Sequence, residues 1–226
     1  MFELSLVLAF ALLPVAGNLV GSMLAESVRA PRWVIGASLH AAAGIAIGVV
    51  SIQLVPRILQ TAPAWLMIAG FLVGALISLA LATGLHSWRQ NLHGSPGAWM
   101  VWVAVGSDLI SDGVMTGAGS AVANIPGGFA ATANLRHQGV ARKRRMAIAA
   151  LLALPVLISA GLGFWLLRDA SAIVQSGALA AIVGVLLLTT VEDIVPQGDA
   201  PQPARWASTA AFAGGFVLLA LLTKVV

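Results

Sequence analysis

The chain contains no cysteine, and only 9% of its 226 residues are charged. The absence of cysteine excludes disulfides, thiolate metal ligands and thiol chemistry. With 59% apolar residues and a mean hydropathy of +0.96, the chain has too few polar side chains to cover the surface of a soluble globule. The sequence therefore predicts an integral membrane protein.

Several functional motifs are also missing from the sequence. No phosphate-binding Gly-x-x-x-x-Gly-Lys loop occurs, which argues against an ATP-driven pump. No Ser/His pair or His-Glu-x-x-His arrangement falls on the apolar segments, so an intramembrane enzyme is the least favoured class. The N-terminus lacks the basic start of a cleaved signal, and its apolar run continues to about Met23. We therefore expect this first segment to remain as a membrane span.

The apolar runs predict an all-α polytopic membrane protein whose eight transmembrane helices form one bundle. Residues 1–226 are expected to make a single transmembrane domain without a separate soluble part. The expected spans are residues 4–23, 33–55, 64–85, 98–117, 121–136, 146–167, 172–195 and 206–223. The 24 glycines suit close contact between helices in lipid.

The twelve Lys and Arg residues divide unequally between the two ends of such a bundle. Arg57, Arg168 and Lys224 fall at the end that carries the termini. The opposite end carries Arg29, Arg32, Arg89, Arg136, Arg142, Lys143, Arg144, Arg145 and Arg205. This distribution predicts a plasma (inner) membrane protein with both termini outside the cytoplasm. Because the basic residues lie in connections between spans, the formal charge of +4 does not indicate a nucleic-acid partner.

Two carboxylates, Asp108 and Asp112, lie one helical turn apart within the expected span 98–117. Each costs roughly 2.5 to 3.5 kcal/mol near the centre of a bilayer, so the pair needs a partner, water or a cation. Protonation, or hydrogen bonds to Ser or Asn, would be the structural alternative to a functional role. Intramembrane carboxylates are usually functional, so the pair indicates a transport site.

Asn124 is a further candidate, because it comes directly before Ile125-Pro126 in the expected span 121–136. Its amide could bind a cation or could bond to a neighbouring helix. Pro126 weakens the helix and frees carbonyl groups that could add ligands. His40 lies in the cytoplasmic third of the second span and favours a packing role over metal binding.

The second and seventh spans resemble each other at an offset of 140 residues. When Pro56 is set against Pro196, Gly44 meets Gly184. The second span enters the membrane from the cytoplasm and the seventh enters from outside. The pattern therefore predicts an inverted repeat that relates spans 1–3 to spans 6–8, as in many secondary transporters.

The segments that run from His40 to Gly44 and from Gln53 to Pro56 carry a resemblance to a known family. So do Asn124-Ile-Pro-Gly-Gly-Phe-Ala130 with the downstream Leu135-Arg136, Gly161-Leu-Gly-Phe164 and Val191-Glu-Asp-Ile-Val-Pro196. Together with eight spans and outward termini, they resemble the ZIP (Zrt/Irt-like) family of divalent metal transporters. In that family the fourth and fifth spans supply the ligands of a metal site at mid-membrane.

The resemblance implies a ligand set that is smaller than the usual one. Asp108 and Asp112 take ligand positions in the fourth span, Ser111 stands where the family has Pro, and Gly127 replaces the Glu of the fifth span. The implied metal ligands are Asp108, Asp112, Asn124 and Ser111, with Ser107 and His40 as weaker candidates. This set favours one cation rather than two. Oxygen ligands suit Mg²⁺, Mn²⁺ or Fe²⁺ at least as well as Zn²⁺.

The function that we expect is secondary transport of a divalent metal cation of the zinc, iron or manganese class toward the cytoplasm. No resident cofactor is expected, and the expected partners are the lipid bilayer and the metal ion; a homodimer is compatible with the sequence. Two alternatives remain open. One is a ZIP-fold protein that has lost transport and acts as a sensor or assembly partner. The other is a proton-coupled carrier of another small solute, in which Asp108 and Asp112 relay protons.

Overall fold

The computed structural model describes residues 2–89 and 119–225 of the chain. Within these two ranges the regular structure is entirely helical, so the all-α prediction is confirmed for them. The expected span 98–117 lies outside the described residues.

The described helices follow one another with short connections. Their bounds are Phe2–Ser27 (α1), Arg32–Gly48 (α2), Val49–Leu54 (the π-helix η1), Val55–Thr61 (α3), Ala64–Arg89 (α4), Gly119–Ala123 (α6), Ile125–His137 (α7), Arg142–Leu151 (α8), Ala153–Leu167 (α9), Ala172–Leu188 (α10), Thr189–Ile194 (the π-helix η2), Val195–Asp199 (α11) and Arg205–Val225 (α12). Several of them join end to end into longer rods, such as α2–η1–α3, α8–α9 and α10–η2–α11.

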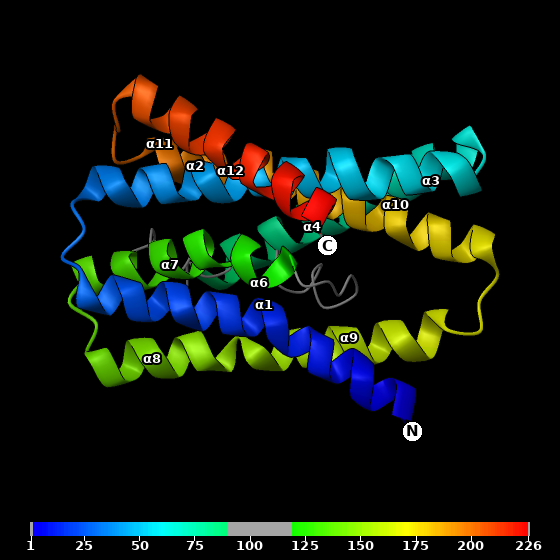
Figure 1. Cartoon of the computed structure of the whole chain (residues 1–226), viewed down its shortest axis with the longest axis horizontal. Coiled ribbons are helices and arrows are strands. Elements are labelled where there is room, and N and C mark those ends of the chain that lie inside the picture. Colours follow the sequence, from blue (N-terminus) through cyan, green and yellow to red (C-terminus); the bar gives the residue numbers. More distant parts are fainter. Residues whose placement is uncertain (1, 90–118, 226) are drawn as a thin grey trace.

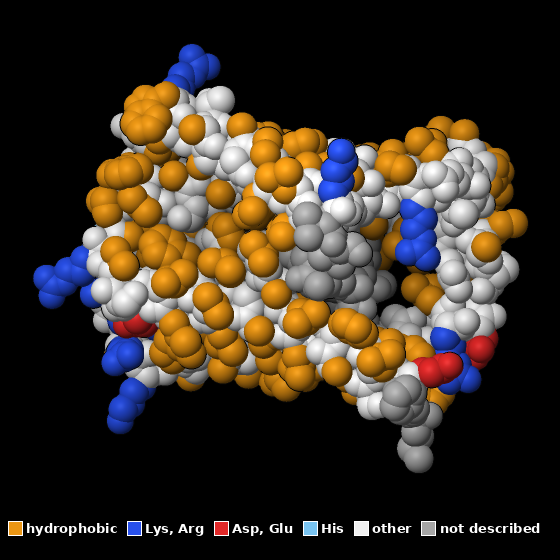
Figure 2. All heavy atoms as spheres, in the orientation of Figure 1, with side chains coloured by type: hydrophobic (Ala, Val, Ile, Leu, Met, Phe, Trp, Pro, Cys, Tyr) orange, Lys and Arg blue, Asp and Glu red, His pale blue; other side chains and the backbone are white. Residues whose placement is uncertain are grey.

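Six stretches within the described residues are long and apolar enough to cross a membrane. They are Glu3–Ser27, Arg32–Thr61, Ala64–Thr83, Arg142–Leu167, Ala172–Asp199 and Arg205–Lys224. Each overlaps one expected span. The expected span 121–136 corresponds to α6 and α7, which are interrupted at Asn124. Figure 2 shows apolar side chains over the middle of the molecule and charged side chains mainly toward its ends, as an integral membrane protein requires.

The helices form two groups that lie side by side (Figure 1). In the first group α1 packs against α6, α7, α8 and α9. In the second group α2 packs against α11 and α12, and α10 packs against α3 and α4. The main contact between the groups joins α2 to α7. The connections α1–α2, α7–α8 and α11–α12 lie at one end of the bundle, and α3–α4 and α9–α10 lie at the other (Figure 1).

Two of the rods widen into a π-helix just before a proline. η1 precedes Pro56 in α3, and η2 precedes Pro196 in α11. Proline has no N–H to donate to the preceding turn and its ring crowds that turn, so the local helix geometry must change. Both π-helices are six residues long, and they begin at Val49 and Thr189, which the sequence offset of 140 also pairs.

Glycines allow the close contact between α2 and α12. A Cβ atom on Gly44 would overlap the carbonyl oxygen of Phe212. A Cβ atom on Gly215 would likewise overlap the carbonyl oxygen of Ala41. The two backbones therefore touch directly, which is how small residues bring helices together in lipid.

The contact between α4 and α10 has the same construction. A Cβ atom on Gly184 would overlap the carbonyl oxygen of Phe71, and one on Gly74 would overlap that of Ala181. Each of these four residues lies 140 or 141 positions from its counterpart in the α2–α12 contact. The two helix pairs are thus built from corresponding glycines.

Candidate functional site

Asn124 lies at the break between α6 and α7, and its side chain is almost completely buried, with 2% of the residue exposed. Its backbone has φ −87° and ψ −6°, and its carbonyl accepts a hydrogen bond from the N–H of Gly128 at 3.0 Å. Pro126 is the second residue of α7 and has no N–H to continue α6. The break therefore follows from the local sequence.

Helix α1 crosses this break at very short distance. A Cβ atom on Gly17 would overlap the carbonyl oxygen of Ala121, and a Cβ atom on Gly21 would overlap that of Ile125. Gly17 and Gly21 are four residues apart and so share one face of α1, in the Gly-x-x-x-Gly pattern of close helix contacts. The backbone of α1 thus covers one side of the break, which the sequence reasoning did not foresee.

The other predicted ligands divide between the described and the undescribed parts of the chain. Asp108, Asp112, Ser107 and Ser111 lie outside the described residues. Among the residues that the structure does describe, no three His, Asp or Glu side chains gather where they could hold a metal ion. Asn124 and the helix break could supply an amide oxygen and backbone carbonyls, so a divalent cation there would need the two carboxylates of the fourth span.

His40 is buried in α2, with 7% of the residue exposed, and both of its ring nitrogens have partners. Nε2 lies 3.2 Å from a carboxylate oxygen of Asp199, and Nδ1 lies 2.9 Å from the carbonyl oxygen of Gly36. A Cβ atom on Gly198 would come within 2.8 Å of the ring, so the absence of a side chain there leaves room for it. Metal binding by His40 would require one of these two contacts to break.

An ion-pair network joins α1, α7 and α8 at the basic end of the bundle. The guanidinium of Arg145 donates to both carboxylate oxygens of Glu26, at 2.6 and 2.7 Å, and Arg142 lies 3.7 Å from the same carboxylate. Arg136 donates to three backbone carbonyls at the end of α1, at distances of 2.9 to 3.2 Å. Arg145 is itself buried, with 8% exposed. Two cations already surround Glu26, so this carboxylate is a structural group and a poor metal ligand.

The sequence reasoning missed this network. It assigned the run from Arg142 to Arg145 to a general positive anchor and did not single out Glu26. The available signal was an acidic residue at the end of an apolar run, on the side of the membrane where basic residues gather. That signal does not say which of the basic residues turns inward.

Comparison of the chain with protein-family models gives no match, and comparison with curated proteins gives none either. The resemblance to the ZIP family therefore depends on the motifs of the chain itself.

Proposed function

We propose that this protein is a secondary transporter that carries a divalent metal cation of the zinc, iron or manganese class across the plasma membrane toward the cytoplasm. In this proposal Asp108 and Asp112 are the principal ligands, and Asn124 and Ser111 assist them. The metal ion is the substrate, and no resident cofactor takes part.

The observation that carries the proposal is the correspondence between the two halves of the second helix group. The π-helices η1 and η2 occupy the same position relative to Pro56 and Pro196. The glycine contacts of α2 with α12 correspond to those of α10 with α4. Both features support an inverted repeat of spans 1–3 and 6–8. Secondary transporters commonly consist of such repeats around a site near mid-membrane, with helices that are broken there.

The distribution of basic residues supports the proposed orientation. The end of the bundle that holds the α1–α2, α7–α8 and α11–α12 connections carries Arg29, Arg32, Arg136, Arg142, Lys143, Arg144, Arg145 and Arg205. Figure 2 shows Lys and Arg side chains extending from this end, at the left of the view. Under the positive-inside rule this end faces the cytoplasm, and both termini face outside.

The division into two helix groups supports a mechanism of alternating access. The first group, α1 with α6–α9, meets the second mainly through α7 and α2. Asn124 lies directly before α7, so it is close to the boundary between the groups. Movement of one group against the other would open a site at this boundary to each side in turn, without nucleotide hydrolysis.

Metal binding to two carboxylates also predicts a dependence on pH. Asp108 and Asp112 must be deprotonated to bind a metal ion, so protons are released when the ion binds. Uptake should therefore slow as the pH falls. Uptake that does not change with pH would count against the pair as the metal site.

Equilibrium binding tests the proposal. We would titrate purified protein in detergent with Zn²⁺, Mn²⁺, Fe²⁺ and Mg²⁺, beside the double variant Asp108→Ala/Asp112→Ala. The matched control is Asp169→Ala, because Asp169 is an exposed carboxylate between α9 and α10. We expect the double variant to lose binding and the control to keep it.

The same titration separates the alternatives. Absence of binding in the wild-type protein would contradict the metal-transporter proposal and favour a ZIP-shaped protein with another role. Binding that survives in the double variant would place the metal elsewhere in the molecule. Proton uptake by Asp108 and Asp112 without metal binding would favour a proton-coupled carrier of another solute.

A further inference from the structure

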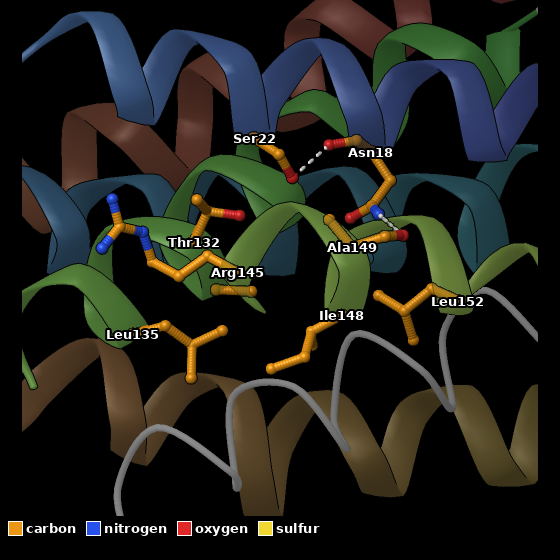
Figure 3. A pocket seen from close by; sticks show the side chains of 9 residues that line it. Asn18, Ser22, Thr132, Leu135, Arg145, Ile148, Ala149 and Leu152 are labelled. Atoms are coloured by element: carbon orange, nitrogen blue, oxygen red, sulfur yellow. Dashed lines mark hydrogen bonds between the residues drawn. The ribbon is translucent and has the colours of Figure 1, made fainter. Parts of the chain in front are cut away.

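A small polar pocket lies within the first helix group, between α1, α7 and α8 (Figure 3). Three side chains with oxygen atoms line it: Asn18 and Ser22 from α1, and Thr132 from α7. Each of these residues is 1% exposed. They belong to none of the metal ligands proposed above, so the pocket requires its own explanation.

Asn18 leaves a hydrogen-bond acceptor without a donor in this pocket. Its Nδ2 donates to the carbonyl oxygen of Ala149 at 3.4 Å. This contact fixes the orientation of the amide, because only the nitrogen can face a carbonyl oxygen. Its Oδ1 is buried and finds no hydrogen-bond partner among the described residues. Buried acceptors of this kind are rare in native proteins and call for a bound group.

Ser22 and Thr132 add two hydroxyl oxygens to the same space. The Ser22 hydroxyl donates to the carbonyl oxygen of Asn18 at 2.8 Å, so its proton is engaged and its oxygen can still accept. Figure 3 shows the Thr132 hydroxyl and the Asn18 Oδ1 turned toward the space between them. Gly128 keeps this space open, because a Cβ atom there would fall 2.7 Å from Asn18 Oδ1.

The size of the space argues against a water molecule. It does not admit a sphere of the size of water unless side chains move, and a buried water needs a cavity at least that large. A dehydrated Na⁺ ion is smaller than a water molecule. The oxygen atoms are therefore arranged for a small ion that has lost its hydration shell.

The charge of the ligands indicates a monovalent cation. The three oxygens are neutral, whereas hard divalent cations are usually bound with the help of carboxylates. Arg145 lines one wall, but both oxygens of the Glu26 carboxylate neutralise its guanidinium, at 2.6 and 2.7 Å. In Figure 3 this guanidinium points away from Asn18.

We propose that this pocket binds one dehydrated monovalent cation of the size of Na⁺, with Asn18 Oδ1, Ser22 Oγ and Thr132 Oγ1 as ligands. The ion provides the unpartnered amide oxygen with a counterpart and ties α1 to α7. The site is separate from Asp108 and Asp112, so it does not depend on the transported metal.

The test is the unfolding temperature of the purified full chain in detergent, measured in NaCl, LiCl, KCl and choline chloride at equal ionic strength. A ligand that binds only the folded state raises this temperature as its concentration increases. We expect a saturable rise in Na⁺ that is absent in choline and smaller in K⁺. Binding of radioactive Na⁺ should saturate at one ion per chain.

Two variants and a control make the test specific to the pocket. Asn18→Ala and Thr132→Val should each lose the response to Na⁺. Ser78→Ala should keep it, because Ser78 is a buried hydroxyl of α4 that faces Thr189, in the other helix group. Thr132→Val preserves shape, so it decides the question even if Asn18→Ala does not fold. Equal unfolding temperatures in Na⁺ and choline, or an unchanged response in Thr132→Val, would overturn the proposal.

Discussion

The Glu26–Arg145 pair illustrates how one residue contact can organise an end of this bundle. Both side chains are largely buried, and the carboxylate receives two hydrogen bonds from the guanidinium. Taking either charge out of water is unfavourable alone, so each side chain depends on its partner. The pair therefore fixes α8 against the end of α1.

Glu26→Gln should destabilise the folded protein by roughly 3 kcal/mol, because it leaves the Arg145 guanidinium buried without a counter-charge. Unfolding in detergent, followed by far-UV circular dichroism, measures the effect. Arg144→Gln is the control, because Arg144 is exposed and should change stability little.

The double variant Glu26→Gln/Arg145→Gln completes a thermodynamic cycle. Because the two side chains contact each other directly, their effects should not add, and the double variant should lose less stability than the sum of the single losses. Additive losses would show that the pair contributes nothing as a unit.

At the scale of the elements, glycine position decides how closely the helices approach. Gly214 and Gly215 are neighbours in α12, yet a Cβ atom on Gly214 would meet nothing within 4 Å, whereas one on Gly215 would overlap the backbone of α2. The two residues therefore provide a matched pair for testing the α2–α12 contact.

Gly215→Ala should destabilise the protein by about 1–3 kcal/mol, because α2 and α12 must separate to admit the methyl group. Gly214→Ala should leave stability unchanged or raise it by up to about 1 kcal/mol, because alanine favours the helix. Thermal unfolding of both variants beside the wild-type protein distinguishes them. Equal effects would contradict the close contact.

Much of the arrangement of the helices could be predicted from the sequence, because the length of an apolar run is set by the membrane. The expected span 64–85 corresponds to α4 at Ala64–Arg89, and the expected span 206–223 corresponds to α12 at Arg205–Val225. The offset between Pro56 and Pro196 also indicated where corresponding helix defects would fall. The choice of a π-helix at these places could not be predicted, because it depends on packing around the preceding turn.

The candidate site could be predicted only in part. Asn124 was predicted because Pro126 follows it and breaks the helix, and the structure places it buried at that break. The crossing of Gly17 and Gly21 over the break, and the polar pocket at Asn18, depend on how α1 packs against α7. Contacts between segments so distant in sequence leave no periodic signal in a single chain. Asp108 and Asp112 lie outside the described residues, so their role stays a prediction.

At the scale of the whole molecule, the proposed orientation can be tested directly because the chain has no cysteine. A single introduced cysteine is then the only reactive thiol. Asp169→Cys lies in the α9–α10 connection and Lys143→Cys lies at the start of α8, at the opposite end.

A membrane-impermeant maleimide applied to intact cells should label Asp169→Cys and should label Lys143→Cys only after the membrane is permeabilised. The reverse pattern would place both termini in the cytoplasm and would reverse the proposed topology.

The central claim is that this bundle carries a divalent metal cation, and flux through reconstituted protein tests it most directly. Proteoliposomes that contain a metal-sensitive dye would be given Zn²⁺, Mn²⁺ or Fe²⁺ outside, with wild-type protein, Asp108→Ala/Asp112→Ala or the Asp169→Ala control. The account predicts saturable entry of at least one of these ions in the wild type and the control, and entry at the level of empty liposomes in the double variant. No entry of any ion with folded wild-type protein, or equal entry with the double variant, would contradict it.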